Sequence, residues 1–197
     1  KTWEALEELR AFGRSRRWKV NKSCGLHIHL DKDSIPNLDK FIRTWKILED
    51  FIFRLMPVSR RDNSFCKPIR GCGFSCEHEV NDSPHTTHGM EMCFRPMRWW
   101  EKCRYHALNR ASISRHNSIE IRLHSGTTDV NKIRYWIIFL LNLVEWSMQA
   151  SERKLALLDI RRGEPKVYEY LLHFLCKTQD ELEYWQSRYI KFNRGGN

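Results

Sequence analysis

Two segments alternate apolar and polar residues, and each alternation predicts a β-strand. In the first strand, predicted over residues 18–31, the alternating sets are Leu26, Ile28 and Leu30 against His27, His29 and Asp31. In the second, predicted over residues 118–124, they are Ile119, Ile121 and Leu123 against Glu120, Arg122 and His124. Successive side chains of a strand point to opposite faces. We therefore expect the polar faces to form one exposed surface and the apolar faces to pack under helices.

Helical spacing of apolar residues predicts the remaining elements. The predicted helices cover residues 2–15, 39–56, 100–108, 129–149, 164–176 and 178–192. The helix over 39–56 presents a stripe made of Phe41, Ile42, Trp45, Leu48, Ile52 and Leu55. The helix over 129–149 is apolar enough to cover a sheet, with a stripe made of Ile133, Trp136, Ile137, Leu140, Leu141 and Val144. The last helix opens on Thr178, with Glu181 three residues later in a capping box.

These elements predict an α+β fold in which an antiparallel sheet is backed by helices. Residues 1–150 form the predicted main domain, and residues 151–197 form a C-terminal helical hairpin packed on it. Residues 58–99 follow no period for long. We expect them to form an irregular insertion that lies over the site or serves as an interaction surface.

The composition fits a globular protein with anionic partners. A 197-residue chain with 41% hydrophobic residues can bury a substantial core, which excludes a disordered or collagenous protein. The 34 Lys and Arg against 24 Asp and Glu leave a net charge of +10, so nucleotides, nucleic acid and acidic substrates are expected partners. The seven cysteines, an odd number, favour reduced thiols in an intracellular, cytoplasmic protein. The longest apolar stretch, residues 135–144, is about half the roughly 20 residues that cross a bilayer, so no membrane span is expected.

The polar strand faces carry residue types that bind metals and phosphates. His27 and His29 stand on one face, roughly 6.5 to 7 Å apart, so both can reach one bound group. Glu120 and Arg122 repeat the spacing and offer a carboxylate for a metal and a guanidinium for a phosphate. With His124, these residues predict a cationic floor that can bind a metal. A solvated sheet face without function is the alternative that residue types alone leave open.

Four segments, in order along the chain, resemble one enzyme family. They read NKSCGLHIHLD at residues 21–31, PVSR at 57–60, YHALN at 105–109 and SIEIRLHSGTTDVNKIRYW at 118–136. Over residues 18–150 this set resembles the amidoligase branch of the glutamine-synthetase-like carboxylate–amine ligases. The resemblance implies a glutamine-synthetase-like catalytic fold and an enzyme that uses ATP and Mg²⁺. Such an enzyme transfers the γ-phosphoryl group of ATP to a carboxylate, and an amine then attacks the acyl phosphate to form an amide.

The resemblance also implies roles for individual residues. His27 and Glu120 correspond to metal ligands, and His29 corresponds to a residue that contacts the nucleotide phosphates. Arg122 corresponds to the residue that faces the transferred phosphoryl group, so Glu120 and Arg122 are the expected catalytic pair. His124 joins His29 and Arg122 among the expected nucleotide-binding residues. Asn109 also matches a family position, where the sequence defines no role beyond support of the site.

One feature of the family is missing from this sequence. Family members carry an upstream strand whose glutamates complete the metal sites, and no such strand precedes the segments above. Mg²⁺ takes six ligands, mostly oxygens, so the site as read has too few. We expect the chain to be the C-terminal portion of a larger catalytic fold, or a second chain to complete the site, or the site to be inactive.

Two further groups of residues indicate sites that a ligase does not require. Cys66, Cys72, Cys76 and His78 offer soft ligands for zinc, although no Cys-x-x-Cys pair is present. Basic residues interleave with aromatic ones over residues 95–104, and a second basic run covers 14–19, which is typical of single-strand nucleic-acid binding. The alternative function is therefore a non-catalytic relative that acts as a structural, assembly or polyanion-binding protein.

Overall fold

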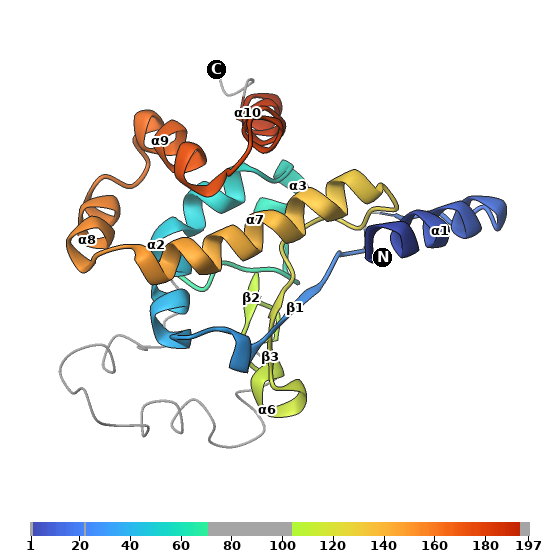
Figure 1. The fold of residues 1–197 in the computed structure, drawn as a ribbon, viewed down its shortest axis with the longest axis horizontal. Coiled ribbons are helices and arrows are strands. Elements are labelled where there is room, and N and C mark those ends of the chain that lie inside the picture. Colours follow the sequence, from blue (N-terminus) through green and yellow to red (C-terminus); the bar gives the residue numbers. More distant parts are fainter. Residues whose placement is uncertain (1, 22, 71–103, 194–197) are drawn as a thin grey trace.

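The chain folds into a small sheet with helices packed against it (Figure 1). A computed structural model describes residues 2–21, 23–70 and 104–193. Its elements are α1 (Thr2–Ser15), β1 (Ile28–Asp31), the 3₁₀ turn η1 (Lys32–Ser34), α2 (Leu38–Arg54), α3 (Val58–Arg61), β2 (Leu108–Asn109), α6 (Ser112–His116), β3 (Ser118–Ile121), α7 (Val130–Gln149), α8 (Glu152–Ile160), α9 (Pro165–Leu175) and α10 (Gln179–Asn193). The predicted α+β class is confirmed.

The three strands form an antiparallel sheet in the order β1-β3-β2. The register places His29 opposite Glu120, and Asn109 opposite Glu120 on the other side. The two predicted strands therefore pair directly, although both are shorter than expected. Beyond the ladder, the chain continues beside its partner through a bridge between Gly25 and Ser125. The central strand thus carries Glu120 between two neighbours.

The prediction of a helix over 100–108 is wrong for residues 104–108, the part of this range that the structure describes. Residues 104–107 form turns and a bridge, and Leu108 already lies in β2. The backbone of this segment is used by other parts of the chain: Ala107 donates to the Lys67 carbonyl at 2.8 Å, and Arg122 donates to the Ala107 carbonyl at 2.8 Å. These long-range hydrogen bonds replace the local ones that a helix would make.

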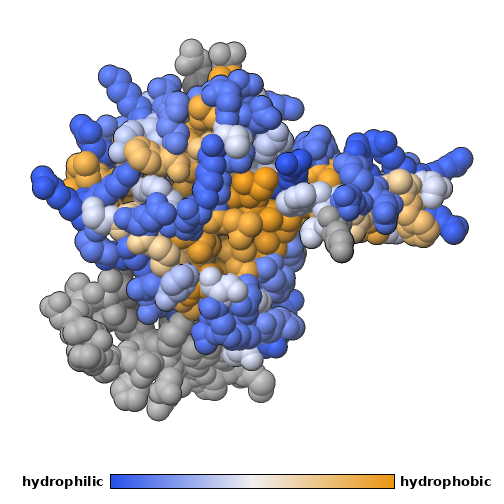
Figure 2. Space-filling view, in the orientation of Figure 1, coloured by the Kyte–Doolittle hydropathy of each residue, from blue (hydrophilic) through white to orange (hydrophobic). Residues whose placement is uncertain are grey.

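Helices α2 and α7 pack against the apolar face of the sheet. The predicted stripe is buried, as expected, although its last member, Leu55, follows the end of α2. In α7 the buried side chains include Trp136, Phe139, Leu140 and Leu143, whereas Leu141 is 53% exposed. The predicted stripe of α7 is therefore wrong at Leu141. Figure 2 shows that apolar side chains also gather on the outer surface of the molecule over the α7 region, with polar residues around them.

The C-terminal helices complete the core on the side of α7 away from the strands (Figure 1). Trp185 of α10 is buried, and its ring lies 4.9 Å from that of Phe139 and 6.0 Å from that of Trp136. Thr178 accepts a hydrogen bond from the Glu181 amide at 3.3 Å, which confirms the predicted N-cap. The Glu181 carboxylate accepts a hydrogen bond from the Lys177 amide, and not from the Thr178 amide as a capping box requires. Helix α8 was not predicted from the sequence.

No helix in the described part of the chain is long and apolar enough to cross a membrane. Cys24, Cys66 and Cys176 are free thiols.

Candidate active site

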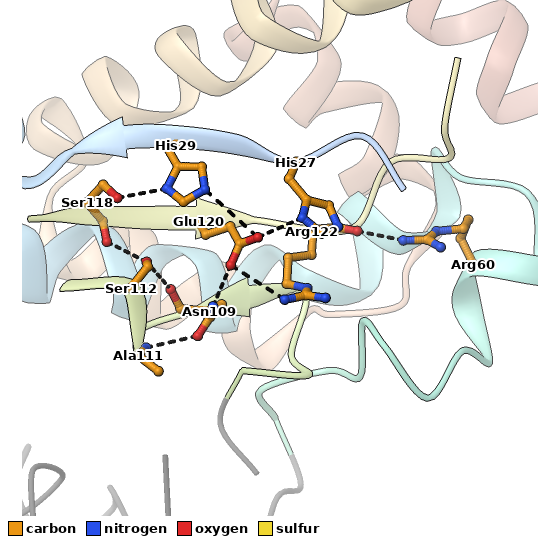
Figure 3. Close-up of polar contacts among 9 residues, drawn as sticks. All are labelled: His27, His29, Arg60, Asn109, Ala111, Ser112, Ser118, Glu120 and Arg122. Atoms are coloured by element: carbon orange, nitrogen blue, oxygen red, sulfur yellow. Dashed lines mark hydrogen bonds and ion pairs between the residues drawn. The ribbon is translucent and has the colours of Figure 1, made fainter. Parts of the chain in front are cut away.

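Glu120 is the centre of a polar cluster on the open face of the sheet (Figure 3). Its Oε1 lies 2.7 Å from His27 Nδ1 and 3.9 Å from His29 Nε2. Its Oε2 accepts a hydrogen bond from Asn109 Nδ2 at 2.5 Å and lies 3.5 Å from an Arg122 guanidinium nitrogen. The three strands and the residues next to them thus bring four nitrogen-bearing side chains around one carboxylate. Four of the five predicted site residues, His27, His29, Glu120 and Arg122, meet there.

These contacts keep the Glu120 carboxyl ionised although it is nearly buried. Burial by itself raises the pKa of this carboxyl, because it disfavours the charged form. The hydrogen bonds from His27 and Asn109 and the charge of Arg122 outweigh that effect and lower the pKa to about 2. Glu120 is therefore a fixed negative charge at any physiological pH.

His27 points one ring nitrogen at Glu120 and leaves the other free for a ligand. Because the Glu120 carboxylate can only accept, the 2.7 Å contact requires His27 Nδ1 to donate. A neutral His27 then presents the lone pair of Nε2, which is the arrangement by which carboxylates orient metal-binding histidines. A Cβ atom at Gly25 would lie 3.0 Å from this Nε2. Gly25 thus keeps space beside the free nitrogen.

His29 is held at the edge of the cluster by two contacts. Its Nδ1 lies 2.8 Å from the Ser118 hydroxyl, and its ring meets the ring of His116 edge to face at 5.9 Å between centroids. The side chain of His29 is 45% exposed. It is therefore oriented by the protein and still open to a ligand from solvent.

Asn109 positions Glu120 from the β2 side, a role that the sequence did not define. Asn109 is 4% exposed, and its Oδ1 accepts from the Ala111 amide at 2.9 Å while its Nδ2 donates to Glu120. Ser112 donates to the Ser118 carbonyl at 2.5 Å and ties the start of α6 to β3. The side chain of Asn109 therefore links the Glu120 carboxylate to the turn after β2. The pairing of Asn109 with Glu120 indicates this role, but the sequence alone does not show which residues of the two strands are paired.

Arg60 fixes the backbone at the end of β3. It is 5% exposed, and its guanidinium donates to the carbonyls of Arg122 at 2.6 Å and Leu123 at 2.9 Å. These carbonyls follow the last ladder residue, Ile121, so Arg60 replaces a neighbouring strand there. The Arg122 side chain is thereby held over the open face, and its buried Nε has no hydrogen-bond partner among the described residues.

His124 does not join the cluster. It is 1% exposed, and its ring lies 5.6 Å from the ring of Trp136 in the core. Burial lowers the pKa of His124 to about 4, so the ring is neutral at physiological pH. Since β3 ends at Ile121, strand alternation no longer decides where the side chain at position 124 points. The structure therefore offers no support for a nucleotide-binding role of His124.

Two hollows open beside this cluster. One, of about 270 Å³, is lined by Glu120, Arg122 and Asn109 together with residues of α6 and Arg104. The second, of about 430 Å³, is shallower and is lined by His29, Asp31, His116 and Ser118. Both hollows share His29 and His116, so a ligand over Glu120 has space on each side of that pair.

Comparison with known proteins identifies the family of the chain. A family described as "Putative amidoligase enzyme" matches residues 1–144, close to three quarters of the chain. The chain belongs to the amidoligase family. No curated protein and no solved structure is similar enough to extend the comparison.

The described residues supply only part of a magnesium site. Within residues 2–21, 23–70 and 104–193, no three His, Cys, Asp or Glu side chains are placed to hold a metal ion. The Glu120 oxygens are occupied by His27 and Asn109, and the free donor is His27 Nε2. One carboxylate and one imidazole fall short of the six ligands that Mg²⁺ takes.

The other predicted sites lie mostly outside the described residues. Of the zinc candidates, Cys72, Cys76 and His78 fall there, and the described Cys66 is buried with its thiol donating to the Arg60 carbonyl at 3.3 Å. Burial raises the pKa of the Cys66 thiol, which disfavours the thiolate that binds zinc. Of the basic and aromatic run over 95–104, only Arg104 is described.

Proposed function

We propose that this amidoligase is an ATP-dependent carboxylate–amine ligase that activates a carboxylate as an acyl phosphate. The observation that carries the proposal is the Glu120 cluster, in which a permanently ionised carboxylate stands 3.5 Å from Arg122 on an open sheet face. The buried and unpartnered Nε of Arg122 supports it, because a phosphoryl oxygen can satisfy a donor that the described residues leave unused.

Phosphoryl transfer requires positioning and charge neutralisation more than covalent help from the protein. In the proposed reaction, a carboxylate oxygen attacks the γ-phosphorus of ATP and ADP leaves, so the acid becomes an acyl phosphate. An amine then attacks the acyl carbon and phosphate leaves. Arg122 binds the oxygens of the transferred group, and His29 contacts the neighbouring phosphates. Glu120 holds Arg122 and His27 in place.

Mg²⁺ is the proposed metal partner of ATP. His27 would hold it through Nε2 while Glu120 orients the His27 ring through Nδ1, and phosphate oxygens and water would have to provide the other positions. When bound, such an ion neutralises charge on the phosphate oxygens.

Turnover tests the proposal. The protein is incubated with ATP, Mg²⁺, hydroxylamine as the amine, and a set of amino acids and short acidic peptides as the acids. We expect ADP and an acyl hydroxamate in equal amounts, detected by mass spectrometry. Arg122→Gln should lower the rate at least a hundredfold, because it removes the charge that faces the phosphoryl group. Arg153→Gln removes the same charge from exposed α8 and should leave the rate unchanged.

ATP breakdown that needs no acid and forms no hydroxamate would contradict the proposal. Steeply salt-dependent binding of oligonucleotides, with no response to ATP, would favour the polyanion-binding alternative.

A further inference from the structure

The 270 Å³ hollow beside Glu120 carries more positive charge than its own carboxylate balances. Three arginines line it, namely Arg104, Arg115 and Arg122, together with His29 and His116. Glu120 is the only carboxylate among its described lining residues. Positive charges that gather in one hollow attract an anion to it.

Two of these arginines are not used by the Glu120 cluster. Arg122 has Glu120 at 3.5 Å, but neither Arg104 nor Arg115 has an ion pair with any carboxylate in the described part of the chain. The guanidinium of Arg104 lies over the ring of its neighbour Tyr105, at 5.0 Å from the centroid. Both side chains are exposed at the rim of the hollow and free to bind a ligand.

Arg115 and the Glu120 cluster belong to one hydrogen-bonded frame. Arg115 belongs to α6, whose first residue donates to the Ser118 carbonyl at the start of β3. The turn before α6 is tied to Asn109, which also binds Glu120. A ligand that touches Arg115 and Arg122 therefore meets two cations whose backbones are fixed relative to each other.

From this we propose that the rim formed by Arg104 and Arg115 binds a second, non-reacting carboxylate of the acid substrate. The inference rests on the proposed function and deepens it, because it assigns the substrate to the class of acids with two or more negative groups. The reacting group lies at Arg122, and the second carboxylate lies at the rim. A hollow of about 270 Å³ is at the small end of ligand sites, which suits a compact dianion better than a nucleoside.

The test is an NMR-detected titration of the whole chain with acetate and with the dicarboxylates succinate, glutarate and adipate, at constant ionic strength. We expect at least one dicarboxylate to bind ten times more tightly than acetate. The double variant Arg104→Gln, Arg115→Gln should reduce this preference to within twofold. Arg115→Lys keeps the charge and should retain most of the preference. Arg153→Gln on α8 is the charge-matched control and should change nothing.

Three results would overturn the assignment. They are equal binding of acetate and all dicarboxylates by the unaltered chain, an unchanged preference in the double variant, and a double variant that loses ATP affinity as much as dicarboxylate affinity. The last result would indicate that the rim binds the phosphates of the nucleotide instead. Failure of the proposed function looks different, since it would leave the dicarboxylate preference intact while ATP fails to bind.

Discussion

Glu120 shows how neighbouring side chains decide the chemistry of a single residue. A carboxyl placed in a sheet and almost covered would be expected to hold its proton, because burial raises its pKa. His27, Asn109 and Arg122 reverse that tendency and lower the pKa to about 2. The same contacts orient the three partners, so the ionised carboxylate is the fixed point from which the site is built.

The pH dependence of stability follows from this shift. The pKa of Glu120 is lower in the folded protein than its ordinary value of 4.5, so its ionised form stabilises the fold above that value. This stabilisation is lost as the pH falls from about 4.5 towards 2 and amounts to about 3 kcal/mol in total. Urea denaturation of the unaltered protein and of Glu120→Gln should therefore show a difference in unfolding free energy that is constant above pH 5 and narrows below it. A difference that stays constant down to pH 2 would contradict the account.

At the scale of elements, the end of α1 illustrates a helix stop built by a non-glycine residue. Trp18 donates its amide to the Gly13 carbonyl at 2.9 Å, and Arg17 donates to the Arg14 carbonyl at 3.0 Å, which is the Schellman pattern. The Phe12 and Trp18 rings meet at 5.7 Å and provide the hydrophobic contact of this motif. Arg17 itself lies at φ 55°, a left-handed conformation that disfavours residues with a Cβ.

Arg17→Gly should therefore stabilise the end of α1 by about 0.5 to 1 kcal/mol, because glycine adopts this conformation without a steric cost. The measurement is amide hydrogen exchange of the α1 residues, which should slow severalfold. Arg14→Gly, inside the same helix, is the matched control and should speed the exchange. Faster exchange in Arg17→Gly would contradict the account. It would show that the Arg17 side chain stabilises the end of α1 by more than its left-handed conformation destabilises it.

The sequence predicted elements well wherever local pattern and tertiary contacts agree. The helix over 2–15, the stripe of α2 and the paired polar strands needed only periodicity. The apolar face of α7 was harder, because this helix has apolar residues on most sides, and contact with Trp185 helps to decide which side is buried. His124 was misplaced because alternation was carried past the end of β3, and Asn109 was left without a role because its partner lies on another strand.

For the whole molecule, the structure changes the meaning of the net charge of +10. Part of it is concentrated in one hollow, where three arginines and two histidines surround a single described carboxylate. A generally basic surface would attract any polyanion, whereas in the proposed function the phosphates of ATP are bound at Arg122. ATP affinity should therefore depend on that position and not on the total charge.

Isothermal titration of ATP in the presence of Mg²⁺ tests this central claim most directly. Loss of a charged hydrogen bond costs about 1.5 to 3 kcal/mol, so Arg122→Gln should weaken ATP binding by at least tenfold. Arg153→Gln, which lowers the net charge by the same amount at exposed α8, should bind ATP as the unaltered chain does. Absence of ATP binding by the unaltered chain, or equal affinity in both variants, would contradict the account.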